Sequence, residues 1–354
     1  MAKFEAFSCD GVTGAYIDQI PVSAFTWNRL LSARGEGTAT IQIDGTHDKA
    51  QLRDLLQHWS RVIRLDRDGQ TQYMGYIVGR PYWQGRSSVQ VKLVDLWGLL
   101  DRRGAWDHTA PNVELWKQTV TGSLRDQAVA AIRRGRDSGP ALPAMAMPVT
   151  LPGLQGGSIS RTYYGYHVET VGDVLSDLLD EGLDIYFQPR RVGNGDGDWL
   201  MNAGPSWSSG VKREFHVNAD DVVISFTENS DAMRVTNNAR YVGEGSEVDM
   251  LVRSNRNTAS PYPLLDRITD RKNISNTSQL TALANQDLVA YEHPTFQWDF
   301  QVTADTQIDV GDEVRLWFVG DPWIADGAHD RRVVKVSGGL GDKITVSVQP
   351  TGGA

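Results

Sequence analysis

Residues 48–77 read DKAQLRDLLQHWSRVIRLDRDGQTQYMGYI, and this stretch contains a helix signal followed by a hairpin signal. Asp48 can cap the first turn of a helix, because Gln51 stands three residues later and can bond back to the Asp48 backbone. The residues that follow at helical spacing are apolar: Leu52, Leu55, Leu56 and Trp59. The pattern therefore predicts a short helix that carries these side chains on one face.

The dipeptide Asp68-Gly69 predicts a β-hairpin directly after this helix. A type I′ turn needs a positive φ at both central positions, and Asp-Gly tolerates that geometry. Strand-like runs flank the dipeptide and recur farther from it: 62–65, 72–78, 38–43 and 89–97. We therefore expect residues 1–104 to form a small, mostly antiparallel β-domain.

Two capping boxes predict helices in residues 105–211, which we expect to form an α+β domain. The boxes are Ser123–Asp126 and Thr170–Asp173, each pairing a hydroxyl with a carboxylate three residues later. Gly182 can end the second helix, since glycine adopts the left-handed conformation found after many helices. The run 183–188 then predicts a strand.

The first of these helices ends in Arg133, Arg134 and Arg136, where the helix dipole favours cations. A phosphate site is the alternative interpretation of the same three side chains. The segment 135–157 that follows is rich in proline, glycine and alanine and has no periodicity. It is expected to be a long loop, or an arm that reaches a partner subunit.

From residue 212 the pattern returns to strands, interrupted by one helix. The helix signal begins at Asn276, with Gln279 three residues on, and ends before Pro294. Strand-like runs stand on both sides of it: 222–227, 233–242, 250–253, 296–303, 313–319, 331–336 and 343–349. A β-rich unit thus occurs at each end of the chain, which predicts a mainly β fold with α insertions.

The composition limits the functions that are possible. The 354 residues include 35 basic and 44 acidic side chains, and the net charge of −9 argues against an electrostatic nucleic-acid binder. Cys9 is the single cysteine, which excludes an intrachain disulfide and a multi-cysteine metal site. It has no cationic neighbour in the sequence, so a nucleophilic role is not expected. The 11 Trp, 35 Gly and 14 Pro favour β-structure with tight turns.

Segments that direct a chain to a membrane are not predicted. No apolar run approaches the roughly 20 residues of a membrane helix. The first residues, Met-Ala-Lys-Phe-Glu, lack the pattern of a signal peptide. We therefore expect synthesis and assembly in the cytoplasm.

The sequence predicts no catalytic, cofactor-binding or metal-binding residues, and hence no enzyme. It lacks a G-x-S-x-G elbow, an H-E-x-x-H pair, a P-loop and a dinucleotide fingerprint. The seven histidines stand singly, at positions 47, 58, 108, 167, 216, 293 and 329. Residues 194–198 resemble the start of a calcium loop, but Trp199 stands where its sixth-position glycine belongs, and a hairpin turn explains them equally. Two carboxylates across a cleft would suffice for a glycosidase, an alternative that the sequence leaves open.

The tryptophans permit two interpretations, as core or interface anchors or as a platform for sugars. Four fall within helix or strand patterns and are expected to be anchors: Trp59, Trp97, Trp298 and Trp317. Six fall in or near loops and remain open: Trp83, Trp106, Trp116, Trp199, Trp207 and Trp323.

Three segments, in order along most of the chain, resemble the hub or minor tail proteins of long-tailed phages, in particular those of actinobacterial hosts. The first is 52–77, in which a helix and a strand lead to Tyr-Met-Gly-Tyr-Ile. The second is 170–187, a capped leucine-rich helix that ends in Glu-Gly-Leu-Asp-Ile-Tyr-Phe. The third is 283–350, with Ile-Asp-Val-Gly-Asp-Glu-Val-Arg-Leu at 308–316.

This resemblance implies a mechanical role. Such hubs are similar to the trimeric hub of contractile-phage baseplates and to the N-terminal part of tail-associated lysins. Each chain of that family contributes two related β-barrel domains, the second split by an insertion. On this basis the expected parts are 1–104, the first barrel-like hub domain; 105–211, a helix-containing domain; 212–245 with 294–354, the second barrel-like domain; and 246–293, an insertion with one helix.

The predicted function is therefore a structural hub at the tail tip of a phage virion, which links the distal tail ring to the host-facing tip and gates DNA ejection. The resemblance implies a homotrimer that contacts the distal tail protein, the tail tube protein, the tape-measure protein and other minor tail or receptor-binding proteins. DNA would be met only in passage, past an acidic lumen, and the host surface indirectly. The alternatives are a tail-associated peptidoglycan hydrolase or glycan-binding tip protein, and a secretion-system spike hub. Because no peptidase or glycosidase pattern precedes Ala354, wall digestion by this chain is not expected.

Overall fold

The computed structural model describes residues 2–136, 146–217, 222–271 and 274–350. It is mostly β, with 46% strand and 18% helix, so the mainly β prediction is confirmed. The loop or arm expected at 135–157 is wrong at its described ends, because α3 runs to Arg136 and Val149–Thr150 pair with β12 as β9; residues 137–145 lie outside the described residues. The chain divides into two compact units: unit 1 is 1–212, 301–312 and 333–346, and unit 2 is 213–300, 313–332 and 347–354.

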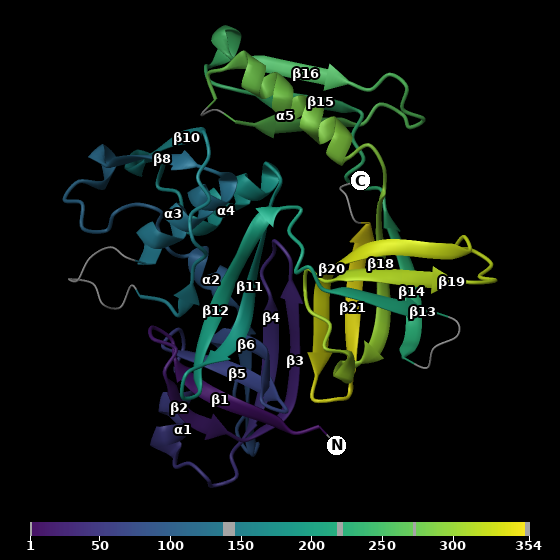
Figure 1. The fold of residues 1–354 in the computed structure, drawn as a ribbon. Helices are drawn as coiled ribbons and strands as arrows, with labels where there is room; N and C mark the ends of the chain where they lie inside the picture. Colours follow the sequence, from purple (N-terminus) through teal and green to yellow (C-terminus); the bar gives the residue numbers. More distant parts are fainter. Residues whose placement is uncertain (1, 137–145, 218–221, 272–273, 351–354) are drawn as a thin grey trace. The chain divides into compact units, whose positions relative to one another are not determined.

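In unit 1, the described part of the first 212 residues forms β-sheets and a group of helices (Figure 1). Its strands are β1 Phe4–Asp10, β2 Tyr16–Ile20, β3 Val22–Leu30, β4 Glu36–Gln42, β5 Arg61–Arg67, β6 Gln70–Gly79, β7 Ser88–Val94, β8 Lys117–Gly122, β9 Val149–Thr150, β10 Ile159–Tyr164, β11 Leu183–Val192 and β12 Asp196–Pro205. Its α-helices are α1 Lys49–Leu55, α2 Leu96–Leu100, α3 Leu124–Arg136 and α4 Val171–Asp180. Short 3-10 turns are η1 Val113–Leu115, η3 Gly165–His167 and η5 Ala304–Thr306.

The local signals of residues 48–77 are confirmed. Asp48 and Gln51 form the capping box of α1, with the Asp48 carboxylate accepting the Gln51 N–H at 2.8 Å. Asp68 and Gly69 both have positive φ, 49° and 80°, and join β5 to β6. The helix placement of Trp59 is wrong, because α1 ends at Leu55 and Trp59 lies beyond it with a φ of 58°. Its side chain nevertheless packs against the core, as expected of an anchor.

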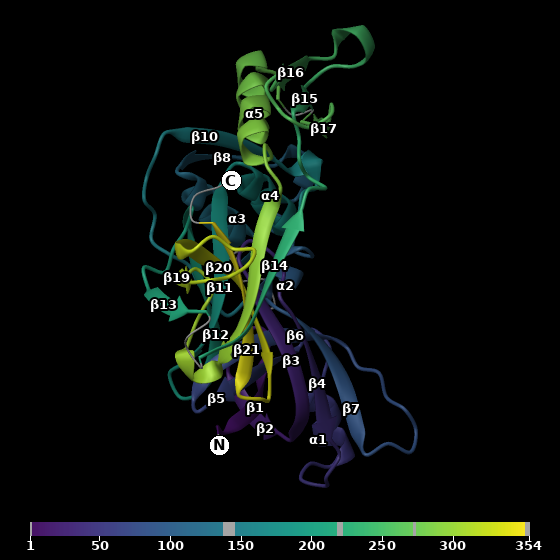
Figure 2. The same cartoon turned by 90° about the vertical axis from the view of Figure 1, so that its right-hand side faces the viewer.

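The largest sheet of unit 1 orders its strands as β20-β3-β4-β7-β6-β5-β1-β2, and all of these pairs are antiparallel. Strands β8 and β10 form a second sheet, and β11, β12 and β9 form a third, in which β9 is parallel to β12. Residues 335–339 of the late strand β20 (Gly327–Gly339) pair with residues 26–30 of β3, which places the end of the chain beside its beginning. Figure 2 shows β3, β4 and β7 side by side. Among the described residues this sheet is an open path that ends at β2, and its strands do not close into a ring.

The helices of unit 1 pack against this sheet through one shared core. Residues of β5 and β6 contact residues of α2, α3, α4, β11 and β12 in that core. This explains why residues 105–211 belong to the same compact unit as the N-terminal strands. Trp97 was expected in a strand, but it lies in α2, because the Asp95 carboxylate accepts its N–H at 3.0 Å and caps the helix.

Unit 2 contains a second set of strands and one long helix. Its elements are β13 Lys212–His216, β14 Val223–Asp231, β15 Asn238–Val242, η4 Glu247–Asp249, β16 Val252–Arg256, β17 Asp266–Asp270, α5 Thr277–Ala290 and β19 Glu313–Phe318. Lys212, the first residue of β13, belongs to unit 1. Asn276 caps α5, as predicted. The small sheet has β15 at its centre, antiparallel to β16 and parallel to β17, and α5 lies along it (Figures 1 and 2).

Four strands belong in part to each unit. They are β13, whose first residue lies in unit 1, and β18 Thr295–Thr303, β20 Gly327–Gly339 and β21 Lys343–Pro350. The chain passes from one unit to the other at five places, after Lys212, Phe300, Asp312, Arg332 and Val346. Neither unit is therefore a continuous piece of sequence.

Candidate functional site

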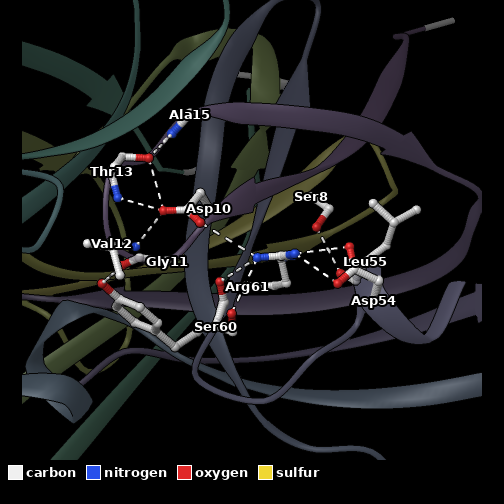
Figure 3. A network of polar contacts seen from close by, with 11 residues as sticks. Ser8, Asp10, Gly11, Val12, Thr13, Ala15, Asp54, Leu55, Ser60 and Arg61 are labelled. Atoms are coloured by element: carbon white, nitrogen blue, oxygen red, sulfur yellow. Dashed lines mark hydrogen bonds and ion pairs between the residues drawn. The ribbon is translucent and has the colours of Figure 1, made fainter. Parts of the chain in front are cut away.

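A polar network joins the β1–β2 turn to α1 and β5 in unit 1 (Figure 3). The Asp10 carboxylate accepts the N–H groups of Val12 and Thr13 at 3.0 and 2.8 Å. The Arg61 guanidinium lies 3.6 Å from Asp10 and bonds both oxygens of Asp54, at 2.9 and 3.0 Å. Partial burial opposes ionisation of Asp10, but the bonds from Thr13 and Val12 and the charge of Arg61 hold its pKa below the ordinary value. The network fixes a turn, and its carboxylates are already occupied.

A buried ion pair lies beside that network. The Arg64 guanidinium bonds both carboxylate oxygens of Asp66 at 3.0 Å, and the two side chains are 1% and 2% exposed. Arg64 also donates to the carbonyl of Gly195 and stacks over the Phe7 ring, whose centroid is 4.8 Å from the guanidinium carbon. Thr71 donates its hydroxyl to Asp66 at 2.9 Å. The pair thus fastens β5 to the β11–β12 hairpin, and both charges are satisfied within the core.

A second polar cluster brings together three distant segments of unit 1. Arg29 of β3 lies 3.3 Å from Asp309, and burial of Arg29 is outweighed by the charge of Asp309, which raises the pKa of Arg29. The Tyr186 hydroxyl and the Gln188 amide of β11 donate to the same carboxylate at 2.7 and 2.9 Å. Asp309 thus links β3 and β11 to the segment that precedes β19, which indicates a structural role.

Asp95 is a buried carboxylate whose pKa lies far above its ordinary value. It accepts the N–H of Gly35 at 2.7 Å and that of Trp97 at 3.0 Å, but burial dominates and raises its pKa to about 7. Asp95 and the buried Tyr73 line a cavity of about 10 Å³, which has room for roughly one water molecule. A raised pKa is common at catalytic sites, but this cavity is too small for a substrate.

We expect Asp95 to make unit 1 less stable as the pH rises. Its pKa is about 7 in the folded chain and 3.8 ordinarily, so between these values the folded state keeps a proton that the unfolded state has lost. The free energy of unfolding should therefore fall from about pH 4 to about pH 7 through this group. In urea unfolding, the free energy of unfolding of Asp95→Asn should fall less steeply with pH than that of the unaltered chain. Equal dependence on pH in the two proteins would contradict the pKa assigned to Asp95.

The residues that resemble a calcium loop form the end of the turn after β11 and the first three residues of β12. The Asp196 carboxylate accepts the N–H of Tyr16 at 2.9 Å. Asp198 is buried and bonds Arg190 at 2.6 Å and the Thr150 hydroxyl at 2.8 Å. Both carboxylates thus hold the hairpin to its neighbours, and the turn interpretation explains the segment. Within the described ranges, no three His, Cys, Asp or Glu side chains lie together as metal ligands would.

Cys9 is inaccessible and uncharged at neutral pH. It is fully buried in β1, and this burial raises the pKa of its thiol to about 11, although Arg64 acts in the opposite direction. A thiol with a raised pKa is a poor nucleophile, since the thiolate is the reactive form.

The arginines that end α3 do not gather around one point. Arg134 is buried, donates to the Gln118 side chain at 3.0 Å and stacks over the Tyr163 ring at 4.3 Å. Arg136 donates to the carbonyl of Val149 at 3.1 Å. Arg133 is exposed. The helix-end interpretation explains Arg134 and Arg136, and Arg133 is free to meet a partner.

The tryptophans separate into buried and exposed groups. Trp199 is fully buried and stacks on Tyr76, with ring centroids 5.5 Å apart. Trp97 and Trp298 are also buried, as expected of anchors. Trp83 and Trp323 are 53% and 80% exposed. The sequence pattern around Trp199 did not identify it as the largest fully buried side chain.

A groove of about 880 Å³ lies in unit 1 between β8 and α3. Two carboxylates line it, and each is held by its own loop. Asp107 accepts the N–H and hydroxyl of Thr109, which lower its pKa. Burial opposes ionisation of Asp126, but N–H groups of Gln155 and Ser123 outweigh it and lower that pKa too. Both carboxylates are therefore ionised near neutral pH and already accept hydrogen bonds from the protein.

Helices able to cross a bilayer, by length and apolar character, were not found in the part of the chain that the structure describes.

Comparisons with known proteins identify the fold. No family model and no curated protein sequence matches the chain. The 43 kDa tail protein of prophage MuSo2 from Shewanella oneidensis is 10% identical, with a TM-score of 0.59 over 99% of both chains. A tail protein from Neisseria meningitidis MC58 is 16% identical, with a TM-score of 0.58 over 99% of this chain and 97% of that one. A type VI secretion component from E. coli, described as similar to the phage T4 tail proteins gp27 and gp5, is 11% identical, with a TM-score of 0.52 over 94% and 74%. The chain therefore has the fold of these phage tail proteins.

Proposed function

We propose that this chain is a structural hub protein at the distal end of a long phage tail. The observation that carries the proposal is the length of the structural likeness, which covers 99% of this chain and 99% and 97% of two phage tail proteins. A single shared domain would match only part of each chain. The sequence resemblance noted in segments 52–77, 170–187 and 283–350 supports the same role independently.

The finer form of the proposal is a homotrimer in which each chain supplies two related β-barrel-like domains. The first is 1–104, the second is 212–245 with 294–354, and 105–211 and 246–293 are the helix-containing parts. Six such domains would match a hexameric tail tube. The proposed neighbours are the distal tail, tail tube, tape-measure and receptor-binding proteins.

The oligomeric state tests this proposal. Native mass spectrometry of the purified chain should give a particle of three times the 39.2 kDa chain mass. Electron microscopy of intact tails should place the chain on the threefold axis at the tip. A stable monomer at micromolar concentration, together with absence from imaged tails, would contradict the hub role.

The net charge of −9 leads to a proposal for DNA passage. Phosphates bind basic surfaces, so an acidic lumen would let DNA slide past without adhering. A structure of the assembled trimer should show carboxylates along its central passage. A neutral or basic passage would contradict this part of the proposal and leave the hub role intact.

We further propose that the chain is not an enzyme, against the alternative of a peptidoglycan hydrolase. The carboxylates Asp107 and Asp126 of the groove have lowered pKa values, and Asp95 is enclosed in a cavity of about 10 Å³. A zymogram on host cell wall should show no cleared band for the purified chain, with lysozyme as the positive control. A cleared band that the purified protein reproduces would overturn this assignment.

A further inference from the structure

The edge groove, as we call the groove between β8 and α3, has one wall made of strand and one made of helix. Residues 117–121 of β8 form the first wall, and Asp126, Ala130 and Arg133 of α3 lie on the second. The small side chain of Ala130 leaves space at the middle of the helical wall. Five strand residues span about 16 Å, so the groove can take an extended segment of similar length.

One edge of β8 is open among the described residues, since β8 pairs with β10 and with no other described strand. The Gln127 amide shows which backbone groups face that open edge. It donates to the carbonyls of both Val120 and Ile159, at 3.0 and 3.1 Å, so both carbonyls lie between the two strands. Bonding directions alternate along an antiparallel strand. The N–H and C=O groups of Thr119 and Thr121 therefore point away from β10 and toward the groove.

The cations of the edge groove are more available than its carboxylates. Lys117 and Arg133 are exposed and form no ion pair with any residue the structure describes. Asp126 is bonded to the N–H groups of Ser123 and Gln155, and Asp107 is bonded to Thr109. In a chain with a net charge of −9, this gives a locally cationic rim around an open strand edge.

We propose that the edge groove binds an extended, acidic segment of a partner protein, which adds to β8 as a further antiparallel or parallel strand. Thr119 and Thr121 would supply backbone hydrogen bonds, as at other sheet edges that recruit peptides. Lys117 and Arg133 would select glutamate or aspartate side chains by charge. The proposal does not depend on the hub role, because it concerns a surface within unit 1.

The test uses the full-length chain and a fluorescein-labelled seven-residue peptide that alternates glutamate and valine. Fluorescence polarisation should show saturable binding that weakens as salt rises. The matched peptide with lysine in place of glutamate should bind at least about tenfold more weakly. Two further peptides carry N-methyl groups on alternate residues, in one register or the other. Only the peptide whose methyl groups replace the N–H groups that face β8 should lose binding. The protein itself is unaltered in this comparison.

Variants locate the site. Thr119→Pro removes an N–H group that faces the groove and leaves the ladder to β10, so it should weaken binding at least about tenfold. Lys117→Glu with Arg133→Glu should have a similar effect. Lys49→Glu with Arg53→Glu reverses two exposed cations of α1 and is the control for an equal change in net charge, so it should leave binding unchanged.

Three results would overturn the proposal. The first is a lack of binding by the acidic peptide, and the second is binding that both N-methylated peptides retain. The third is self-association of the unaltered chain that Thr119→Pro abolishes, which would make a second copy the occupant.

Discussion

Replacing Asp66 by alanine is expected to lower the free energy of unfolding of unit 1 by about 3–5 kcal/mol, because it leaves a buried arginine without its counter-charge. Arg64 and Asp66 are 1% and 2% exposed, and the two hydrogen bonds between them are both 3.0 Å long. The change also removes the acceptor of the Thr71 hydroxyl. Urea unfolding followed by far-UV circular dichroism measures the difference.

Two further variants show whether burial is the cause. Glu36→Ala breaks the Arg34–Glu36 pair, whose side chains are 49% and 60% exposed, and should cost less than about 1 kcal/mol. Arg64→Met combined with Asp66→Leu removes both charges and should recover much of the loss. If Asp66→Ala unfolds at the same urea concentration as Glu36→Ala, the pair is not enclosed in solution.

Replacing Trp199 by alanine is expected to cost about 3–5 kcal/mol, since it opens a large cavity in a close-packed core. The indole is 0% exposed and stacks on Tyr76 with an interplanar angle of 18°. Its strand neighbour across the parallel pair is Val149 of β9, so the cavity would lie where the hairpin meets the helices. The same urea unfolding, followed by circular dichroism, gives the magnitude.

Trp83→Ala is the matched control, because it makes the same chemical change at a side chain that is 53% exposed. Surface substitutions usually change stability by less than about 0.5 kcal/mol. Similar losses at Trp83 and Trp199 would contradict the burial assigned to each.

Elements with local signals could be predicted from the sequence, and elements fixed by distant contacts could not. The capping boxes at Asp48 and Thr170 and the turn at Asp68-Gly69 depend on residues at most three apart. Strand β3 was missed, although Phe25 and Trp27 alternate along it, because Arg29 interrupts the apolar face. Arg29 is tolerated there because Asp309, far along the chain, pairs with it.

The edge groove was missed for a related reason. Residues 117–122 read Lys-Gln-Thr-Val-Thr-Gly, and their β-branched residues favour a strand, but no apolar alternation accompanies them. That strand is stabilised by β10, some forty residues later, and by the Gln127 side chain. The loop tryptophans were left open by the sequence, since position in a loop does not determine burial: Trp199 is buried and Trp83 is not.

The five passages of the chain between the two units affect how the protein carries load and how its gene can change. A force that pulls the units apart would be shared by five lengths of backbone, four of which lie inside β13, β18, β20 and β21. A single cut in one exposed loop would leave the others intact. Each unit is encoded by three separate stretches of the gene, so a single recombination event could not exchange one unit alone. We therefore expect the whole chain to be inherited as one module.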